Sequence, residues 1–177
     1  LLPDLAGPVA AFPAREVSPA ESAHAEGRAG RYQLLEAGLP GSEAVLANIL
    51  TAVLREGGGS AGLLGSHDLE SLREHKVRTI LLLDDFSGSG GQLIKFHKAI
   101  RRHKTIRSWT SYRLIDFHVL AYAATDKAAR LLRRHFGDDK VHILRACPTF
   151  EGAGWTLEQR TEVEALCRDS AGRRKKN

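Results

Sequence analysis

Residues 84–91 combine two carboxylates with a turn rich in small residues. Asp84 and Asp85 are adjacent, and the turn that follows them contains Ser87, Gly88, Ser89, Gly90 and Gly91. Carboxylates can accept hydrogen bonds from vicinal hydroxyls, whereas glycine amides and serine hydroxyls can surround a phosphate. A helix that begins after such a turn adds favourable electrostatics for an anion at its N-terminus. The pattern therefore predicts a sugar-phosphate site, with the acids for a ribose and the turn for the phosphate.

Alternating strands and helices are expected to hold this turn in place. Residues 77–83 end in the apolar run Ile80 to Leu83, which predicts a strand buried on both faces. A helix is expected over residues 89–103, because Leu93, Phe96 and Ile100 recur at helical spacing. A strand, a helix and a third strand are then expected over residues 116–122, 125–136 and 141–146. This order indicates an α/β fold with a doubly wound parallel sheet, in which ligands bind beyond the carboxyl ends of the strands.

The segment from Ile80 to Leu93 resembles a known motif. Four apolar residues, two acids and a Gly/Ser loop are similar to the phosphoribosyl-pyrophosphate (PRPP) motif of type I phosphoribosyltransferases. The form Asp-Asp-Phe-x-Gly-Ser-Gly, with Ser108-Trp109 and the segment Phe117 to Tyr122 downstream, resembles more specifically the bacterial domains called PRTase-CE. Those domains are linked by gene neighbourhood to conflict and defence systems.

The resemblance implies a type I phosphoribosyltransferase-like fold and a division of roles. Asp84 and Asp85 would bind the ribose hydroxyls of PRPP or of a phosphoribosyl nucleotide. The loop of Ser87, Gly88, Ser89, Gly90 and Gly91 would hold the 5′-phosphate, with Mg²⁺ carried by the ligand and no direct metal ligands in the protein. Gly88 replaces a usual Thr, and Gln92 stands where a Thr normally supplies a hydroxyl. Ligand binding is therefore better supported than transferase turnover, and the catalytic residues stay unassigned.

Two other readings of the same residues stay open. The loop also resembles the Asp-Pro-Phe-x-Gly-Ser-Gly loop of DNA amino-methyltransferases, which holds S-adenosylmethionine. Their second motif would fall at Cys147-Pro148-Thr149-Phe150, which lacks the polar first residue and the second Pro. The other alternative is a non-catalytic sensor or assembly module with a degenerate site.

Composition shifts suggest three parts of the chain. Residues 1–31 mix Pro, Ala, Gly and Glu without periodicity and predict an extended or poorly ordered arm. Residues 32–150 are expected to form the phosphoribosyltransferase-like domain. Within it, a helix starts at Ser42, presents one apolar face and ends before a Gly57-Gly58-Gly59 run. Residues 151–177 would be a C-terminal extension, and we expect it to be truncated.

Positive charge is concentrated in the middle of the chain. The chain has 26 Lys and Arg against 21 Asp and Glu, but residues 76–145 alone carry 15 against six. The stretch from Lys95 to Arg107 contains no acid, which favours either a solvated face or a flank that binds nucleic acid. A partner protein or fused domain is the other macromolecular partner we expect. No apolar run approaches the length of a membrane span, so no membrane partner is expected.

Cysteine and histidine usage argues against a structural metal or a disulfide framework. The two cysteines are Cys147 and Cys167, and the eight histidines show no metal-ligand spacing. A reducing, cytoplasmic setting is the simplest expectation.

Overall fold

The computed structural model describes residues 5, 7–17, 24–26, 32–34, 42–56, 63–64, 69–150 and 152–174. The chain divides into two compact units, Leu1–Ala146 and Cys147–Asn177. The first unit contains the sheet and the predicted site. The second contains α6 (Leu157–Arg174), preceded by a segment in which the rings of Phe150 and Trp155 lie 5.6 Å apart.

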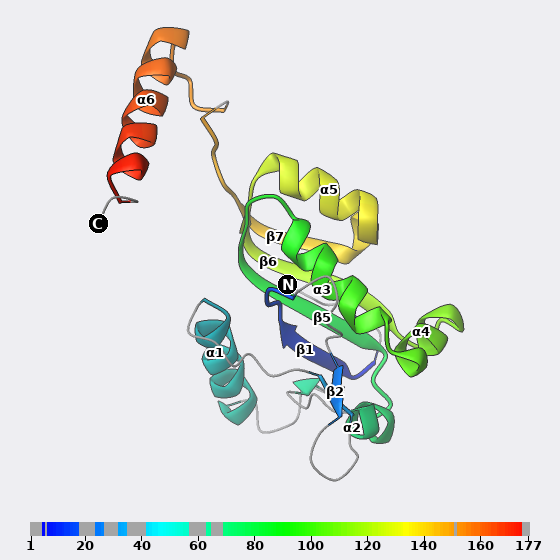
Figure 1. The fold of residues 1–177 in the computed structure, drawn as a ribbon. Coiled ribbons are helices and arrows are strands. Elements are labelled where there is room, and N and C mark those ends of the chain that lie inside the picture. Colours follow the sequence, from blue (N-terminus) through cyan, green and yellow to red (C-terminus); the bar gives the residue numbers. More distant parts are fainter. Residues whose placement is uncertain are drawn as a thin grey trace. The chain divides into compact units, whose positions relative to one another are not determined.

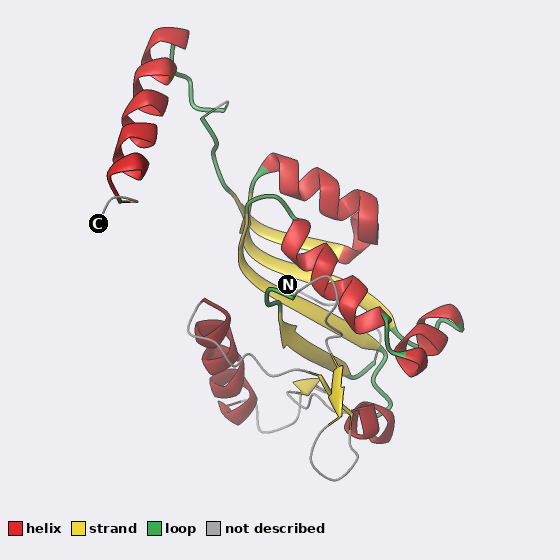
Figure 2. Cartoon of the chain, viewed as in Figure 1, coloured by secondary structure: helices red, strands yellow, loops and turns green. Residues whose placement is uncertain are grey.

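A five-stranded, all-parallel sheet forms the centre of the first unit (Figures 1 and 2). Its strand order is β4-β1-β5-β6-β7. The strands are β1 (Val9–Pro13), β4 (Leu63–Leu64), β5 (Thr79–Ser87), β6 (Asp116–Ala124) and β7 (Val141–Ala146). A separate antiparallel pair is formed by β2 (His24–Glu26) and β3 (Tyr32–Leu34). The predicted fold class, a doubly wound α/β sheet, is confirmed.

Helices cover the two faces of the sheet unequally. α2 (Leu69–Glu74), α3 (Gly91–Arg101), α4 (Lys104–Ser111) and α5 (Asp126–Phe136) pack on one face, where they share a core with Ile80, Leu82 and Val119. α1 (Ser42–Glu56) packs on the other face, against a smaller cluster that includes Leu50 and Leu81. A 3₁₀ turn, Asp138–Lys140, leads into β7. We call the face covered by α2, α3, α4 and α5 the multi-helix face, and the face covered by α1 the α1 face.

β5 lies inside the sheet, as its apolar run predicts. Ile80 and Leu82 are fully buried on the multi-helix face, whereas Leu81 and Leu83 lie on the α1 face. The strand is longer than the prediction of residues 77–83, because its pairing with β6 continues to Ser87, opposite Ala124. The following helix accordingly begins at Gly91 and not at residue 89. The β6, α5 and β7 predictions agree with the structure to within two residues at each end.

The predicted N-terminal arm contains a strand of the sheet. Val9–Pro13 forms β1, which pairs with β4 on one side and β5 on the other. Ala10, Ala11 and Phe12 are buried there. The sequence gives little warning of this strand, since it is five residues long, contains two alanines and ends in Pro13. Residues 24–26, in β2, are also part of this predicted arm, whereas residues 1–4, 6, 18–23 and 27–31 fall outside the described residues.

α1 confirms the helix predicted from Ser42, but its apolar stripe is only partly buried. Leu50 is buried, whereas Val45, Ile49 and Val53 are about half exposed. Among the described residues, the α1 face of the sheet is therefore incompletely covered. Among the residues that the structure describes, no helix is long and apolar enough to cross a membrane.

Candidate functional site

The two acids of the motif lie within β5, near its carboxyl end. Asp84 stands opposite Ala121 of β6 and is buried, with 9% of its surface exposed. Asp85 is half-buried, and its Oδ1 accepts a hydrogen bond from the backbone N–H of Phe86 at 2.8 Å. Because β5 continues past both acids, their backbone is fixed by the sheet and not by a flexible loop. The two carboxylates leave β5 towards opposite faces, because side chains alternate along a strand, and both lie near the edge where parallel sheets bind ligands.

The loop from Ser87 to Gly91 is tied to the connection between β6 and α5. The hydroxyl of Thr125 donates to the carbonyl of Gly88 at 2.7 Å, and its backbone N–H donates to the carbonyl of Ser87 at 3.2 Å. The same hydroxyl accepts from the N–H of Ala128 and so caps α5. Thr125 therefore holds the candidate phosphate loop in one shape. The sequence predicted a helix from residue 125 but gave no sign of the contact between Thr125 and the loop.

Gly90 is required for packing as well as for backbone conformation. Its φ is +73°, in the left-handed region that favours glycine. A Cβ atom at this position would lie 3.2 Å from Cγ of Leu132 and 3.4 Å from the carbonyl oxygen of Ala128, both on α5. The turn can therefore start α3 only by passing close against α5. From the sequence we expected Gly90 to let a phosphate approach. In the structure, the space that a side chain at this position would fill is occupied by α5.

The amide donors of this turn lie at the start of α3. The N-cap is Gly90, which has no side chain to accept from the first amides of the helix. The N–H of Gly91 donates to Oγ of Ser89 at 3.2 Å. Gly88 and Ser89 are exposed, so this part of the loop is open to a ligand. Exposed small residues beside helix amides give the chemistry that an anionic oxygen requires.

The carboxyl end of β1 contributes a cation that the sequence analysis missed. The N–H of Ala14 donates to the carbonyl of Leu83 at 2.7 Å, so the chain leaving β1 stays beside β5. Arg15 follows and is half-buried. The strand order reverses between β1 and β5, which makes this the switch point where open α/β sheets form their binding crevice. Arg15 was overlooked because β1 was not recognised as a strand.

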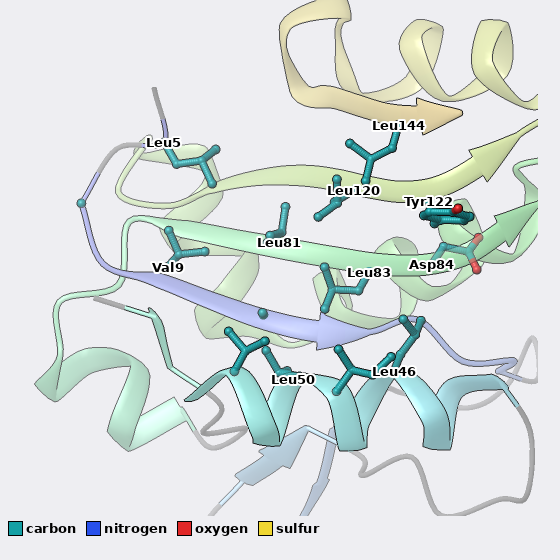
Figure 3. Close-up of a pocket in the computed structure, with 14 residues that line it drawn as sticks. Leu5, Val9, Leu46, Leu50, Leu81, Leu83, Asp84, Leu120, Tyr122 and Leu144 are labelled. Atoms are coloured by element: carbon teal, nitrogen blue, oxygen red, sulfur yellow. The ribbon is translucent and has the colours of Figure 1, made fainter. Parts of the chain in front are cut away.

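An apolar hollow of about 520 Å³ lies on the α1 face and has Asp84 in its lining (Figure 3). Leu46 and Leu50 of α1 form one wall, and Leu81, Leu83 and Leu120 of the sheet form the other. Asp84 and Tyr122 lie together at the end nearest the carboxyl ends of the strands (Figure 3). An apolar or aromatic group could therefore be bound next to the carboxylates.

Two histidine pairs lie in the sheet and its helices, away from the predicted motif. Nδ1 of His97 and Nε2 of His135 are 2.9 Å apart, so one ring donates to the other. Burial lowers the pKa of His97 to about 3, and the neighbouring His135, Arg101 and Lys98 contribute to the shift. His118 and His142 stack with ring centroids 5.7 Å apart. No group of three metal-ligating side chains occurs among the described residues.

The candidate second motif of a methyltransferase falls outside the unit that holds the sheet. Residues 147–150 follow β7 and belong to the second unit. Cys147 there is half-buried, and its Sγ donates weakly to the carbonyl of Pro148. The structure gives no observation that favours a base-gripping role for these residues.

The parallel sheet with helices on both faces is an α/β fold consistent with a phosphoribosyltransferase-like domain. The model of the PRTase-CE family matches residues 34–176, which is most of the chain, and the chain belongs to this family. The match includes β5 and the whole of the loop that follows, but not β1. Neither the comparison with curated proteins nor that with solved structures found a match.

Proposed function

We propose that this protein binds PRPP or a phosphoribosyl nucleotide, together with Mg²⁺, at the carboxyl ends of β1 and β5. The observation that carries the proposal is the placement of one continuous segment, Asp84 to Gly91, at the switch point of the sheet. It offers carboxylates, hydroxyls and amides in the order in which a ribose phosphate would need them.

Each part of the ligand has a matching group. Asp85 is half-buried, so its free oxygen can accept from a ribose hydroxyl while its other oxygen holds the turn at Phe86. The exposed loop residues Gly88 and Ser89 and the start of α3 suit a 5′-phosphate. Arg15 lies at the carboxyl end of β1, where its Nη1 donates to the carbonyl of Glu16 at 3.0 Å, and it would add positive charge near a further phosphate. The apolar hollow would offer space for a base.

Magnesium fits this donor set as a ligand-borne ion. Mg²⁺ prefers oxygen ligands and commonly combines one or two carboxylates with substrate phosphates. Here the phosphates and hydroxyls of the ligand would coordinate the ion, and Asp84 and Asp85 would bind the ribose beside it without ligating the metal. Mg²⁺ would neutralise phosphate charge between the carboxylates and the loop. The setting we infer from the family resemblance is a bacterial conflict or defence system in the cytoplasm.

Calorimetric titration with PRPP and with a nucleoside monophosphate, each with Mg²⁺, tests the proposal. We expect both to bind the wild-type chain and Asp85→Asn to weaken them roughly tenfold or more, since a hydrogen bond to a charged group contributes about 1.5–3 kcal/mol. Asp85 is preferred to Asp84 for this test because it is less buried. Asp138→Asn, an exposed acid in the turn before β7, is the matched control and should bind as wild type does.

The phosphate loop is tested separately with inorganic phosphate. Gly88→Val places a branched side chain on the exposed loop, where a Cβ atom meets only the Phe86 ring at 3.5 Å. We expect this variant to lose phosphate and nucleotide binding alike, whereas Asp85→Asn should spare phosphate. Binding of both ligands that is unchanged in both variants would move the site away from residues 84–91. Binding of S-adenosylmethionine in place of PRPP would overturn the proposal in favour of a methyltransferase.

A further inference from the structure

Two rows of basic side chains lie on the solvent side of the multi-helix face. Lys95 and Lys98 of α3 and Arg102, the residue that caps its C-terminus, are exposed at spacings i, i+3 and i+7. α5 exposes Lys127, Arg130 and Arg134 at the same spacings. Each row covers about 10 Å of its helix axis. Both helices follow strands of one parallel sheet, so the rows run in the same direction; we call these six residues the basic face.

The helices that carry the two rows lie against each other. The His97 and His135 rings are within hydrogen-bonding distance, and the start of α3 at Gly90 packs on Leu132 of α5. The positive charges of Lys98 and Arg101 on α3 also lower the pKa of His135 on α5, after the larger effect of burial. The positive charge on α3 therefore acts electrostatically on α5, and the two rows form one positive surface.

Among the described residues, few acidic side chains lie on the helices of this surface. α3 and α4 contain no Asp or Glu, and α5 contains one, Asp126, in its first turn. Within the part of the chain that the structure describes, five members of the basic face make no ion pair: Lys95, Lys98, Lys127, Arg130 and Arg134. α6 behaves differently, because Arg160 and Arg168 both pair with Glu164. An uncompensated positive surface is costly to maintain by self-repulsion and attracts anionic polymers.

The composition of this surface favours nucleic acid over a membrane or an acidic protein. Among the large apolar side chains of α3 and α5, Leu131 is the one exposed to solvent, at 39%. Membrane-bound helices and protein interfaces both need apolar anchors beside their charges. Repeated cations without such anchors suit a polymer that carries one phosphate per nucleotide and is bound through its backbone.

We propose that the basic face binds nucleic acid through its phosphodiester backbone, without reading the base sequence. α3 begins at Gly91, directly after the candidate phosphate loop, and α5 begins after Thr125, which is hydrogen-bonded to that loop. A strand bound along the rows would therefore pass the carboxyl ends of the sheet. The inference rests on α3 and α5 and does not require that residues 84–91 bind PRPP.

Fluorescence anisotropy with the full chain tests the proposal. The probes are labelled single-stranded RNA, single-stranded DNA and duplex DNA of one sequence, each in low and moderate salt, with a second sequence as a check on specificity. The variant Lys98→Gln with Arg134→Gln removes one exposed cation from each row. We expect it to weaken binding roughly tenfold and to reduce the slope of log K against log salt by about 1.5, since each lost phosphate contact changes the slope by about 0.7–0.9.

A second double variant separates location from net charge. Arg55→Gln with Lys76→Gln removes the same number of charges from exposed positions on α1 and in the turn before β5. It should bind the probes as the wild type does. Equal losses in the two variants, or no binding of any probe in low salt, would overturn the proposal. Stronger binding to vesicles of anionic lipid, or to polyglutamate, than to the three probes would also overturn it, in favour of a membrane or an acidic protein.

Discussion

The two faces of the central sheet are built in different ways. On the multi-helix face, α2, α3, α4 and α5 enclose a continuous core and display charges to solvent. Of the described helices, α1 packs on the other face of the sheet. Apolar side chains on that face remain accessible to solvent. Tyr122 is 60% exposed and Leu144 is 45% exposed on this face. The comparison shows one face that supplies stability and another that leaves room beside the acids of β5.

The difference follows from how the chain crosses the sheet. The connections from β5 to β6 and from β6 to β7 each place helices on the same face, because such crossovers have one hand. The crossover that contains α1 leads from β1 to β4 and lies on the opposite face. The hollow on the α1 face therefore opens where β5, β6 and β7 lack the cover that their other face has.

The largest expected difference between the faces is in core truncation. Leu82→Ala removes a fully buried side chain on the multi-helix face and should lower the free energy of unfolding by about 2–5 kcal/mol. Urea denaturation measures it. A midpoint unchanged from wild type would show that this face does not hold the main core.

The second prediction concerns pH and the His97 pair. The pKa of His97 is lowered to about 3 in the folded state, from an ordinary value of 6.5. Between these values the unfolded chain binds a proton that the folded chain does not, so stability falls as the pH falls from about 6.5 towards 3. The decrease should reach at most about 1.4 kcal/mol per pH unit for this one group.

The variant His97→Phe tests this assignment. It removes the titrating ring and keeps an aromatic side chain against Phe117 and Phe136. Its unfolding free energy should depend less on pH than that of the wild type over the same range, in denaturation curves measured at several pH values. The half-buried His118 on the α1 face has a pKa that burial lowers, opposed in part by Asp116, and His118→Phe should alter the profile less. Identical profiles for wild type and His97→Phe would contradict the assignment.

A smaller effect is expected at the turn that joins β5 to the helix layer. Gly90→Ala forces a side chain into a left-handed conformation and against Leu132, and should lower stability by about 1–2 kcal/mol. Gly154→Ala is the control, because a Cβ atom there would meet nothing within 4 Å. Equal thermal midpoints for the two variants would show that α5 does not constrain the loop.

The smallest effect belongs to the α1 face. Ile49→Ser replaces a side chain that is 54% exposed on α1, and should change the free energy of unfolding by about 0.5 kcal/mol or less. Chemical denaturation beside Leu82→Ala compares the two faces directly. If Ile49→Ser lowered the free energy of unfolding as much as Leu82→Ala does, both faces would contribute equally to the core.

The sequence by itself determined β5, β6 and β7, three of the five strands, and the position of the motif. The apolar runs of these strands and the apolar spacing of the helices between them are local signals that need no knowledge of distant contacts. For the same reason, the sequence correctly predicted that the acids and the Gly/Ser turn lie near the end of β5. The end of that strand was misjudged, because pairing with β6 carries β5 on to Ser87.

Only the tertiary structure decided what surrounds the motif. β1 is a strand because β4 and β5 flank it, and its five residues carry no pattern that could specify those partners. The position of Arg15 at the switch point therefore could not be predicted from the local sequence. Thr125 lies 37 residues from Gly88 in sequence and bonds to it only because parallel strands bring their carboxyl ends to one edge. The basic face likewise arises from two helices that are separate in sequence and adjacent through the sheet, since contact between side chains depends on packing and not on order along the chain.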